Sequence, residues 1–205
     1  MNEHGAIDAV VKHGCPRWLD FLMDATGGDA AQVELLQEFA GYCLYPSCSF
    51  QKFLLIHGPG MGKSTFVAVL RFICGPERCV HVTPAEMNSS PEALFKLAGA
   101  RLNTLPGFCL RKRDWQVFKA VVAGDSLSAR AFFIEPTCKV VFTDMQGPPA
   151  TVGESIRRRM IAVRFDRRPS CPDPDLIPKL LEELTYIVMW AVLGLDRLIL
   201  RGGFI

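Results

Sequence analysis

The spacing of apolar residues divides the chain into helical and strand-like stretches. Between residues 16 and 46, apolar side chains recur three and four positions apart, as in Trp18, Phe21 and Leu22. This is the spacing of one face of an α-helix. The glycine pair at 27–28 interrupts the pattern, so the sequence predicts two helices in this region.

Short continuous apolar runs indicate buried strands farther along. Such runs occupy residues 52–58 (KFLLIHG), 138–144 (CKVVFTD) and 157–166 (RRRMIAVRFD). Helical patterns occupy residues 63–74, 90–100, 114–125 and 175–200. The order predicts an α/β fold with a central parallel sheet and a C-terminal helix. We expect an N-terminal helical cap over residues 1–48 and an α/β core over residues 49–205.

Composition fits a globular chain without a membrane span. The 205 residues are 49% hydrophobic, and no apolar run approaches the ~20 residues of a membrane helix. No signal-peptide core is evident, so a cytoplasmic location is expected. The net charge is only +2, yet residues 1–50 carry a balance of −5 and residues 101–170 a balance of +7. The second value fits an anionic partner or a solvated basic face equally well.

Eight cysteines raise the question of a metal site. They contain no C-x-x-C pair, and most lie in apolar surroundings. Zinc is the minor alternative, and buried free thiols are the main interpretation.

The stretch LLIHGPGMGKST, residues 54–65, carries the clearest chemistry. It departs from G-x-x-x-x-G-K-[ST] because His57 occupies the place of the first glycine. Either the loop is one residue short or His57 replaces that glycine. Backbone N–H groups of residues 60–64 would cradle the phosphates of ATP, Lys63 would reach the β/γ oxygens and Ser64 would hold Mg²⁺. The predicted nucleotide-binding residues are Gly58, Pro59, Gly60, Met61, Gly62, Lys63, Ser64 and Thr65.

Several stretches together resemble phage/plasmid-type primase-helicases, whose superfamily 3 helicase domain is a branch of the AAA-like P-loop ATPases. They are WLDFL, LLQEFAGYCL, GPGMGKSTF, LAGARLN, FKAVVAGDSLSAR, KVVFTD, RRRMIAVRF and ELTYIVMWAVLGL. The resemblance implies a homo-oligomeric ring, with a hexamer as a candidate size, that acts on single-stranded or forked DNA during replication. It also implies a bacterial or phage-infected cell and a primase as a further candidate partner.

Two positions depart from the resembled pattern. The strand after LAGARL should end in an acidic residue that holds Mg²⁺ and polarises water, but the matching position is Gly107. No acidic residue lies between Glu92 and Asp114. The next strand should end in asparagine and ends in Asp144, a candidate substitute acid. Impaired hydrolysis is therefore expected, and glutamate at position 107 is expected to raise turnover if the loop tolerates it.

The resemblance also assigns roles to basic residues. The triplet at 157–159 matches the region that gives an arginine finger to a neighbouring subunit, which makes Arg158 and Arg159 catalytic candidates beside Lys63 and Asp144. A hairpin after Gly124 would touch the DNA backbone. The candidate DNA-binding residues are Arg111, Lys112, Arg113, Lys119 and Arg130.

Three functions remain open at this point. The first is a helicase-like ATPase acting on DNA. The second is a non-hydrolysing, nucleotide-gated protein that holds DNA or a partner. The third, a small-molecule kinase, is disfavoured because no lid-like arginine region or acceptor site is evident.

Overall fold

A computed structural model describes residues 10–11, 13–108, 110–129, 132–167 and 173–204. Its helices include α2 (Pro16–Ala25), α3 (Ala30–Leu44), α4 (Lys63–Cys74), α5 (Pro84–Ser89), α6 (Pro91–Ala98), α7 (Trp115–Ala123), α8 (Glu154–Arg157), α9 (Leu176–Glu182) and α10 (Leu184–Arg201). The strands are β1 (Phe53–His57), β2 (Cys79–Val80), β3 (Leu102–Pro106), β4 (Leu127–Ala129), β5 (Phe132–Ile134), β6 (Lys139–Thr143) and β7 (Met160–Arg164). Short 3-10 turns cover Pro76–Arg78 and Lys112–Asp114.

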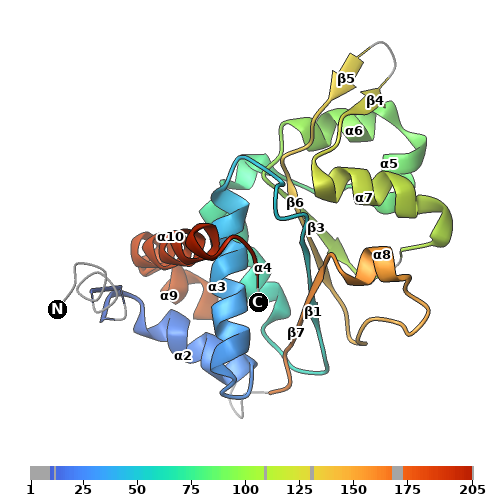
Figure 1. Cartoon of the computed structure of the whole chain (residues 1–205). Coiled ribbons are helices and arrows are strands. Elements are labelled where there is room, and N and C mark those ends of the chain that lie inside the picture. The colour runs from blue at the N-terminus through green and yellow to red at the C-terminus, as the bar shows by residue number, and fades with distance from the viewer. Residues whose placement is uncertain (1–9, 12, 109, 130–131, 168–172, 205) are drawn as a thin grey trace.

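A parallel five-stranded sheet forms the centre of the molecule, in the order β2-β3-β6-β1-β7 (Figure 1). Parallel strands end at the same side of a sheet, so β1, β3, β6 and β7 all end at one edge, here called the carboxyl edge. The opposite side is called the amino edge. The α/β class and the central parallel sheet predicted from the sequence are thereby confirmed.

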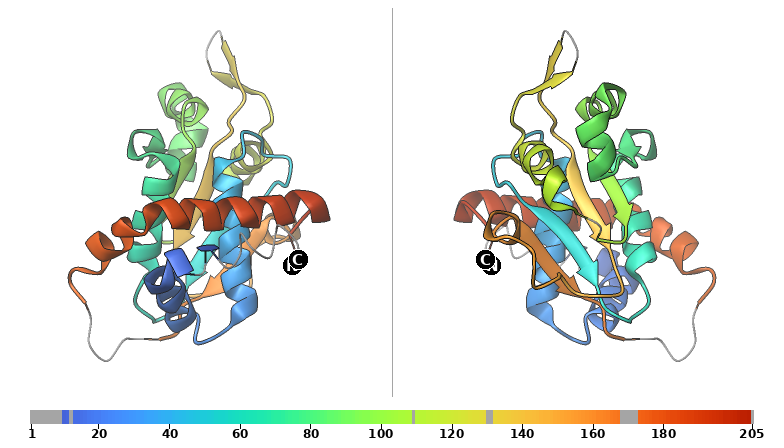
Figure 2. Two further views of the ribbon diagram at one scale, coloured as in Figure 1. Left: turned by 90° about the vertical axis from the view of Figure 1, so that its left-hand side faces the viewer. Right: turned by 90° about the vertical axis from the view of Figure 1, so that its right-hand side faces the viewer.

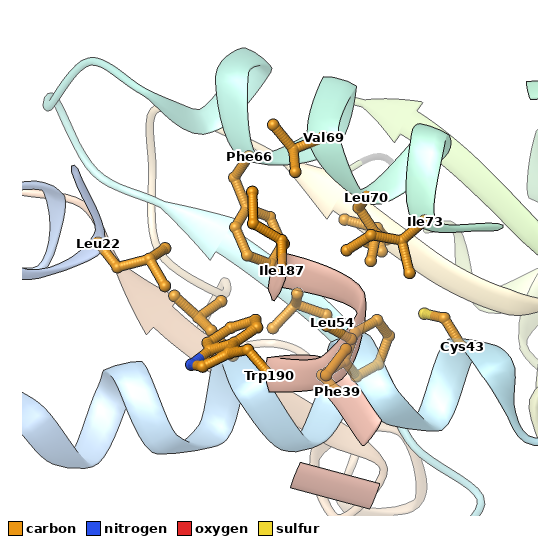
Figure 3. Close-up of a cluster of buried hydrophobic side chains, with 14 of the residues drawn as sticks. Leu22, Phe39, Cys43, Leu54, Phe66, Val69, Leu70, Ile73, Ile187 and Trp190 are labelled. Atoms are coloured by element: carbon orange, nitrogen blue, oxygen red, sulfur yellow. The ribbon is translucent and has the colours of Figure 1, made fainter. Parts of the chain in front are cut away.

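Helices cover both faces of the sheet, and alternating residues of β1 pack against each layer. Leu54 and Ile56 belong to a core shared with α2, α3, α4 and α10 (Figure 3). Phe53 and Leu55 belong to a second core, shared with helices α5 to α8. Burial on both faces explains why β1 reads as a continuous apolar run rather than as an alternating pattern.

Helices α3 and α10 approach closely because each has a glycine at the crossing. A Cβ on Gly41 would lie 2.2 Å from the carbonyl oxygen of Ala191, and one on Gly194 would lie 2.6 Å from the carbonyl of Gln37. Both distances are shorter than any normal contact, so neither position accepts a side chain without separating the helices.

The single C-terminal helix predicted over residues 175–200 is in fact two helices that meet at Glu183. The carboxylate of Glu183 accepts hydrogen bonds from the N–H groups of Arg17, at 3.3 Å, and Trp18, at 3.0 Å. It therefore satisfies two of the unpaired N–H groups at the start of α2. The break in the helix thus joins the C-terminal part of the chain to its N-terminal helices.

Several elements had no counterpart in the periodicity of the sequence, namely β2, β3, α5, α8 and the hairpin of β4 and β5. The hairpin projects from the body of the molecule above α6 and α7 (Figures 1 and 2). Phe132 and Phe133 on β5 are 64% and 79% exposed, and the ring of Phe132 lies 6.1 Å from that of Phe95. No helix in the described ranges is long and apolar enough to cross a membrane.

Candidate functional site

The glycine-rich loop joins the central strand β1 to helix α4 at the carboxyl edge. His57 is a strand residue, because it pairs with Arg164 and its carbonyl accepts the N–H of Phe165 at 2.8 Å. Helix α4 begins at Lys63, so the loop comprises residues 58–62. Of the two interpretations drawn from the sequence, the structure favours a loop that is one residue short.

Lys63 is the first residue of α4 and folds back over the loop. Its Nζ donates to the carbonyl oxygens of Gly58, at 2.6 Å, and Gly60, at 2.8 Å. Gly62, with φ +99°, adopts a left-handed conformation that glycine tolerates and that turns the chain into the helix. The ammonium group therefore sits at the N-terminus of α4, where anions are favoured.

The last residue of β7 and the three residues after it lie against the loop. Residues 164–167, here called the covering segment, accept hydrogen bonds from the loop through the carbonyls of Phe165 and Arg167. Gly60 donates its N–H to Phe165 at 2.8 Å, and Met61 donates to Arg167 at 3.1 Å. Two of the five N–H groups expected to cradle phosphate are thus already bonded within the protein.

The end of β3 carries no acidic residue, as the sequence indicated. Gly107 follows the strand with φ +74°, and its N–H donates to Thr143 at 2.7 Å. The expectation that glutamate here raises turnover depends on whether the loop tolerates a side chain at this position. Space is open around Gly107, but a side chain at this φ would strain the backbone.

Asp144 follows β6, beside the glycine-rich loop, and its N–H donates to Ile56 at 2.9 Å. Its carboxylate accepts from the N–H of Phe108 at 2.5 Å and of Gln146 at 2.9 Å. Burial raises the pKa of Asp144, but hydrogen bonds from Gln146, Phe108 and Met145 outweigh it and hold the pKa below the usual value. This carboxylate is therefore ionised at neutral pH and ties the end of β6 to the loop after β3.

His57 stands among charged groups at the same edge. Burial lowers its pKa, and Arg164 and Lys63 lower it further, against the raising effects of Asp166 and Asp144. The imidazole is therefore neutral at pH 7 and can donate or accept a hydrogen bond.

The residues present fit ATP and Mg²⁺ only in part. Lys63 and the exposed Ser64 open a helix of twelve residues, which is a suitable anion site. Ser64 and Asp144 supply oxygen atoms of the kind that Mg²⁺ prefers. The missing acid after β3 and the two occupied loop N–H groups count against a fully formed site.

The predicted arginine-finger residues lie at the amino edge. The N–H of Phe53, at the start of β1, donates to Arg159 at 2.9 Å, and Lys52 Nζ donates to the Arg158 carbonyl at 2.7 Å. Five-residue strands separate the two edges by roughly 15 Å. These arginines are therefore too far from the loop of their own chain to act on a phosphate there.

A polar cavity of about 650 Å³ opens at the amino edge between α7 and α8. Its lining includes four basic side chains, those of Arg113, Lys119, Arg158 and Arg159, against one acidic side chain, that of Asp125. The structure thus brings predicted DNA-binding residues and predicted finger residues to one basic pocket.

Within this pocket the two arginines differ. Arg159 donates to the Ser155 carbonyl at 2.9 Å and to Gln51 Oε1 at 3.1 Å, whereas Arg158 is exposed. Burial lowers the pKa of Arg159, and the neighbouring Arg158 lowers it further. The buried Nε of Arg159 has no acceptor among the described residues. Of the two arginines, the exposed Arg158 is therefore the one that the pocket presents to an incoming anion.

The other DNA-binding candidates are dispersed. Arg111 and Lys112 are exposed in the turn before α7. Arg130 lies outside the described residues. Lys139, which contributed to the +7 balance, is only 1% exposed, because its Nζ donates to Tyr45 and Thr137 carbonyls. The charge count therefore overstated the basic surface.

The described cysteines are free thiols, and no group of three or more His, Cys, Asp or Glu in the described ranges could hold a metal ion. Cys109 and Cys171 lie outside those ranges. Burial raises the pKa of Cys138 to about 12, and that of Cys15 also to about 12. Such thiols stay protonated at neutral pH, which opposes metal binding.

Comparison with solved structures identifies the fold. The sequence matches no protein-family model and no curated protein sequence. An apo structure of the NrS-1 C-terminal region, in its A form, superposes with a TM-score of 0.67 at 15% identity. The match covers 86% of this chain and 44% of the NrS-1 chain, so this chain spans less than half of the length of the NrS-1 structure.

Two further structures are similar. A second apo structure of the NrS-1 C-terminal region gives a TM-score of 0.66 at 15% identity, with 86% of this chain and 45% of that chain covered. The X-ray structure of JCV helicase gives 0.45 at 18% identity, over 93% of this chain and 68% of that chain. At these identities, the NrS-1 matches show a shared fold.

Sequence reasoning missed the covering segment and the residues that hold it. The N–H of Arg164 donates to Gln32 Oε1 at 2.6 Å, and Arg167 pairs with Asp24 at 3.7 Å. No local motif marks these contacts, because each joins residues more than a hundred positions apart. The basic end of the last strand, with arginines at 164 and 167, was the only signal available.

Proposed function

We propose that this chain is an ATP-binding, helicase-like module that assembles into a ring and acts on single-stranded or forked DNA. The position of Lys63 carries this proposal. It opens α4 directly after the central strand of a parallel sheet, at the edge where such sheets bind ligands. A cytoplasmic role in phage or plasmid replication, with a primase as a candidate partner, follows from the sequence resemblance.

The basic pocket supports the assembled form. Because Arg158 lies at the amino edge, its charge can act on the phosphates of a bound nucleotide only if that nucleotide belongs to another subunit. Arg113 and Lys119 add further positive charge to the same cavity. We infer that the carboxyl edge of one subunit, with its nucleotide, faces this pocket on the next.

We propose that the hairpin of β4 and β5 and the turn before α7 contact the DNA. Arg111 and Lys112 are exposed there and can neutralise backbone phosphates without reading sequence. Phe133 offers an exposed ring on which a base can stack.

A second function is favoured by the end of β3. Without an acid after that strand, the site has lost the usual group that polarises the attacking water. The protein then acts as a nucleotide-gated assembly factor that holds DNA with little turnover. A steady-state ATPase assay with and without single-stranded DNA separates the two functions.

We expect slow hydrolysis in that assay, and Asp144→Asn should lower it by a further ~100-fold or more if Asp144 orients the water. Asparagine keeps one side-chain oxygen, so it can accept only one of the two N–H groups that Asp144 binds through separate oxygens, those of Phe108 and Gln146. Glu77→Gln serves as the control, because Glu77 is an exposed acid just beyond the C-terminal end of α4, at the opposite end of that helix from the loop. Brisk wild-type turnover that survives Asp144→Asn would refute this assignment.

We also expect ATP and single-stranded DNA together to drive association, because both would bind across subunits. Sedimentation velocity should show larger species for wild type and a loss of them for Arg158→Ala. Arg157→Ala is the matched control, since Arg157 is exposed, lies outside the pocket and donates to the Ala150 carbonyl. A chain that stays monomeric at tens of micromolar under all conditions would contradict the ring.

A further inference from the structure

The glycine-rich loop and the covering segment are in contact backbone to backbone. Phe165 and Arg167 supply the carbonyls, and Gly60 and Met61 supply the N–H groups, at 2.8 and 3.1 Å. These N–H groups are among those that a bound phosphate would require. A phosphate and the covering segment cannot both accept the same hydrogen bonds at full strength.

Two glycines of the loop permit this contact. A Cβ on Gly58 would lie 2.5 Å from the Phe165 carbonyl oxygen, and a Cβ on Gly60 would lie 2.4 Å from it. The φ of Gly60 is not positive, so its backbone conformation does not by itself require glycine. The absence of a side chain at Gly60 is therefore explained by the closeness of the covering segment.

The N-terminal helices hold the covering segment in place. Gln32, on α3, accepts the N–H of Arg164 at 2.6 Å through its side-chain oxygen. The Ala25 carbonyl, at the end of α2, accepts the N–H of Asp166 at 3.1 Å, and Asp24 pairs with Arg167 at 3.7 Å. All three restraints come from one region, which lies beside the loop because α2 and α4 share a core.

We propose that the covering segment competes with nucleotide phosphate for the N–H groups of Gly60 and Met61, so that α2 and α3 control access to the loop. This inference rests on the nucleotide binding proposed above. The closed arrangement is a nucleotide-free state, and binding requires the segment to move away. The apparent affinity then equals the intrinsic affinity multiplied by the fraction of molecules in which the loop is open.

The test combines nucleotide binding with hydrogen exchange in the full chain. Binding of a fluorescent mant-ADP with Mg²⁺ is followed by stopped flow. The apparent association rate constant of wild type should be lowered in proportion to the fraction of molecules in which the loop is open. Gln32→Ala removes one hydrogen bond from the closed form and should raise both this rate constant and the apparent affinity by roughly two- to tenfold.

Gln37→Ala is the matched control, because Gln37 lies on the same helix and its side chain bonds the Trp190 carbonyl, away from the loop. It should leave the kinetics unchanged. Gly60→Ala gives a second, opposed test. The added Cβ should displace the covering segment and raise affinity, whereas a glycine needed to admit phosphate would make affinity fall and overturn the proposal.

Amide hydrogen exchange of Gly60 and Met61, measured by NMR without nucleotide, tests the closed arrangement independently of nucleotide binding. Both amides should be protected in wild type, and protection should fall roughly two- to tenfold in Gln32→Ala. Unprotected wild-type amides, or an apparent affinity that Gln32→Ala leaves unchanged, would overturn the competition alone. Protected amides with no mant-ADP binding by any variant would instead show that the proposed nucleotide function is wrong, and the competition with it.

Discussion

Replacing Lys63 with alanine is expected to abolish the stabilisation that ATP and Mg²⁺ give to the wild-type protein. Wild type at a ligand concentration of 100 Kd should gain roughly 2.7 kcal/mol in free energy of unfolding. For a chain of this size, that gain raises the melting temperature by roughly 5–10 °C. Lys63→Ala should show no rise, because the ammonium group is the charge placed at the N-terminus of α4 to meet the phosphates.

The melting temperature of Lys63→Ala must also be measured without nucleotide. Lys63 Nζ also donates to the carbonyls of Gly58 and Gly60, so its loss will lower the stability of the loop even without ligand. Only the difference between liganded and free protein reports on binding. Lys96→Ala is the control for charge removal, since Lys96 is exposed on α6, across the sheet. Wild type that shows no shift at millimolar ATP would contradict the phosphate-binding role of the loop.

Local sequence was sufficient for the elements that present the loop. The run FLLI at 53–56 is buried on both faces, so its continuous apolar character predicts a strand of the sheet interior. Lys63 begins the following helix where the motif requires it. Loop length could not be decided, because His57 can be assigned to the loop or to the strand until its pairing with Arg164 is known.

Other features depend on contacts between distant parts of the chain. Arg113 and Arg158 were assigned different roles, yet both line one pocket, because α7 and α8 converge at the amino edge. Lys139 was counted as surface charge, although Tyr45 and Thr137 carbonyls and the ring of Tyr42 surround its ammonium group. No periodicity within a short window contains that information.

The association of α3 with α10 also depends on contacts between distant parts of the chain. It provides the second prediction with a large expected effect, on the stability of the fold. Glu38 on α3 is fully buried. Its carboxylate accepts from Arg197 Nε at 2.9 Å and from Arg201 Nη2 at 2.5 Å, both on α10. The periodicity of α3 predicts an apolar face around Leu36 and Phe39, and nothing in it shows that Glu38 is inside. The carboxylate is tolerated there because two guanidinium groups compensate its charge.

Removing both arginines, as Arg197→Met with Arg201→Met, should lower the free energy of unfolding by about 3–5 kcal/mol, because it leaves a buried carboxylate without a counter-charge. The melting temperature should fall by on the order of 10 °C. Glu34→Gln is the matched control. Glu34 contacts Arg197 at 3.0 Å, but its side chain is 41% exposed, so its loss should cost less than about 1 kcal/mol.

A third substitution decides whether charge or packing is responsible. Adding Glu38→Met to the doubly substituted chain removes the unpaired carboxylate and leaves three apolar side chains between the helices. If the buried charge causes the loss, stability should return to near the wild-type value, since apolar replacement of a whole buried ion pair is often neutral or stabilising. If the triple variant is as unstable as the double one, the cost instead arises from disrupted packing where Gly41 and Gly194 bring α3 and α10 together. Urea denaturation of all three variants beside wild type, with m-values compared, would distinguish these outcomes.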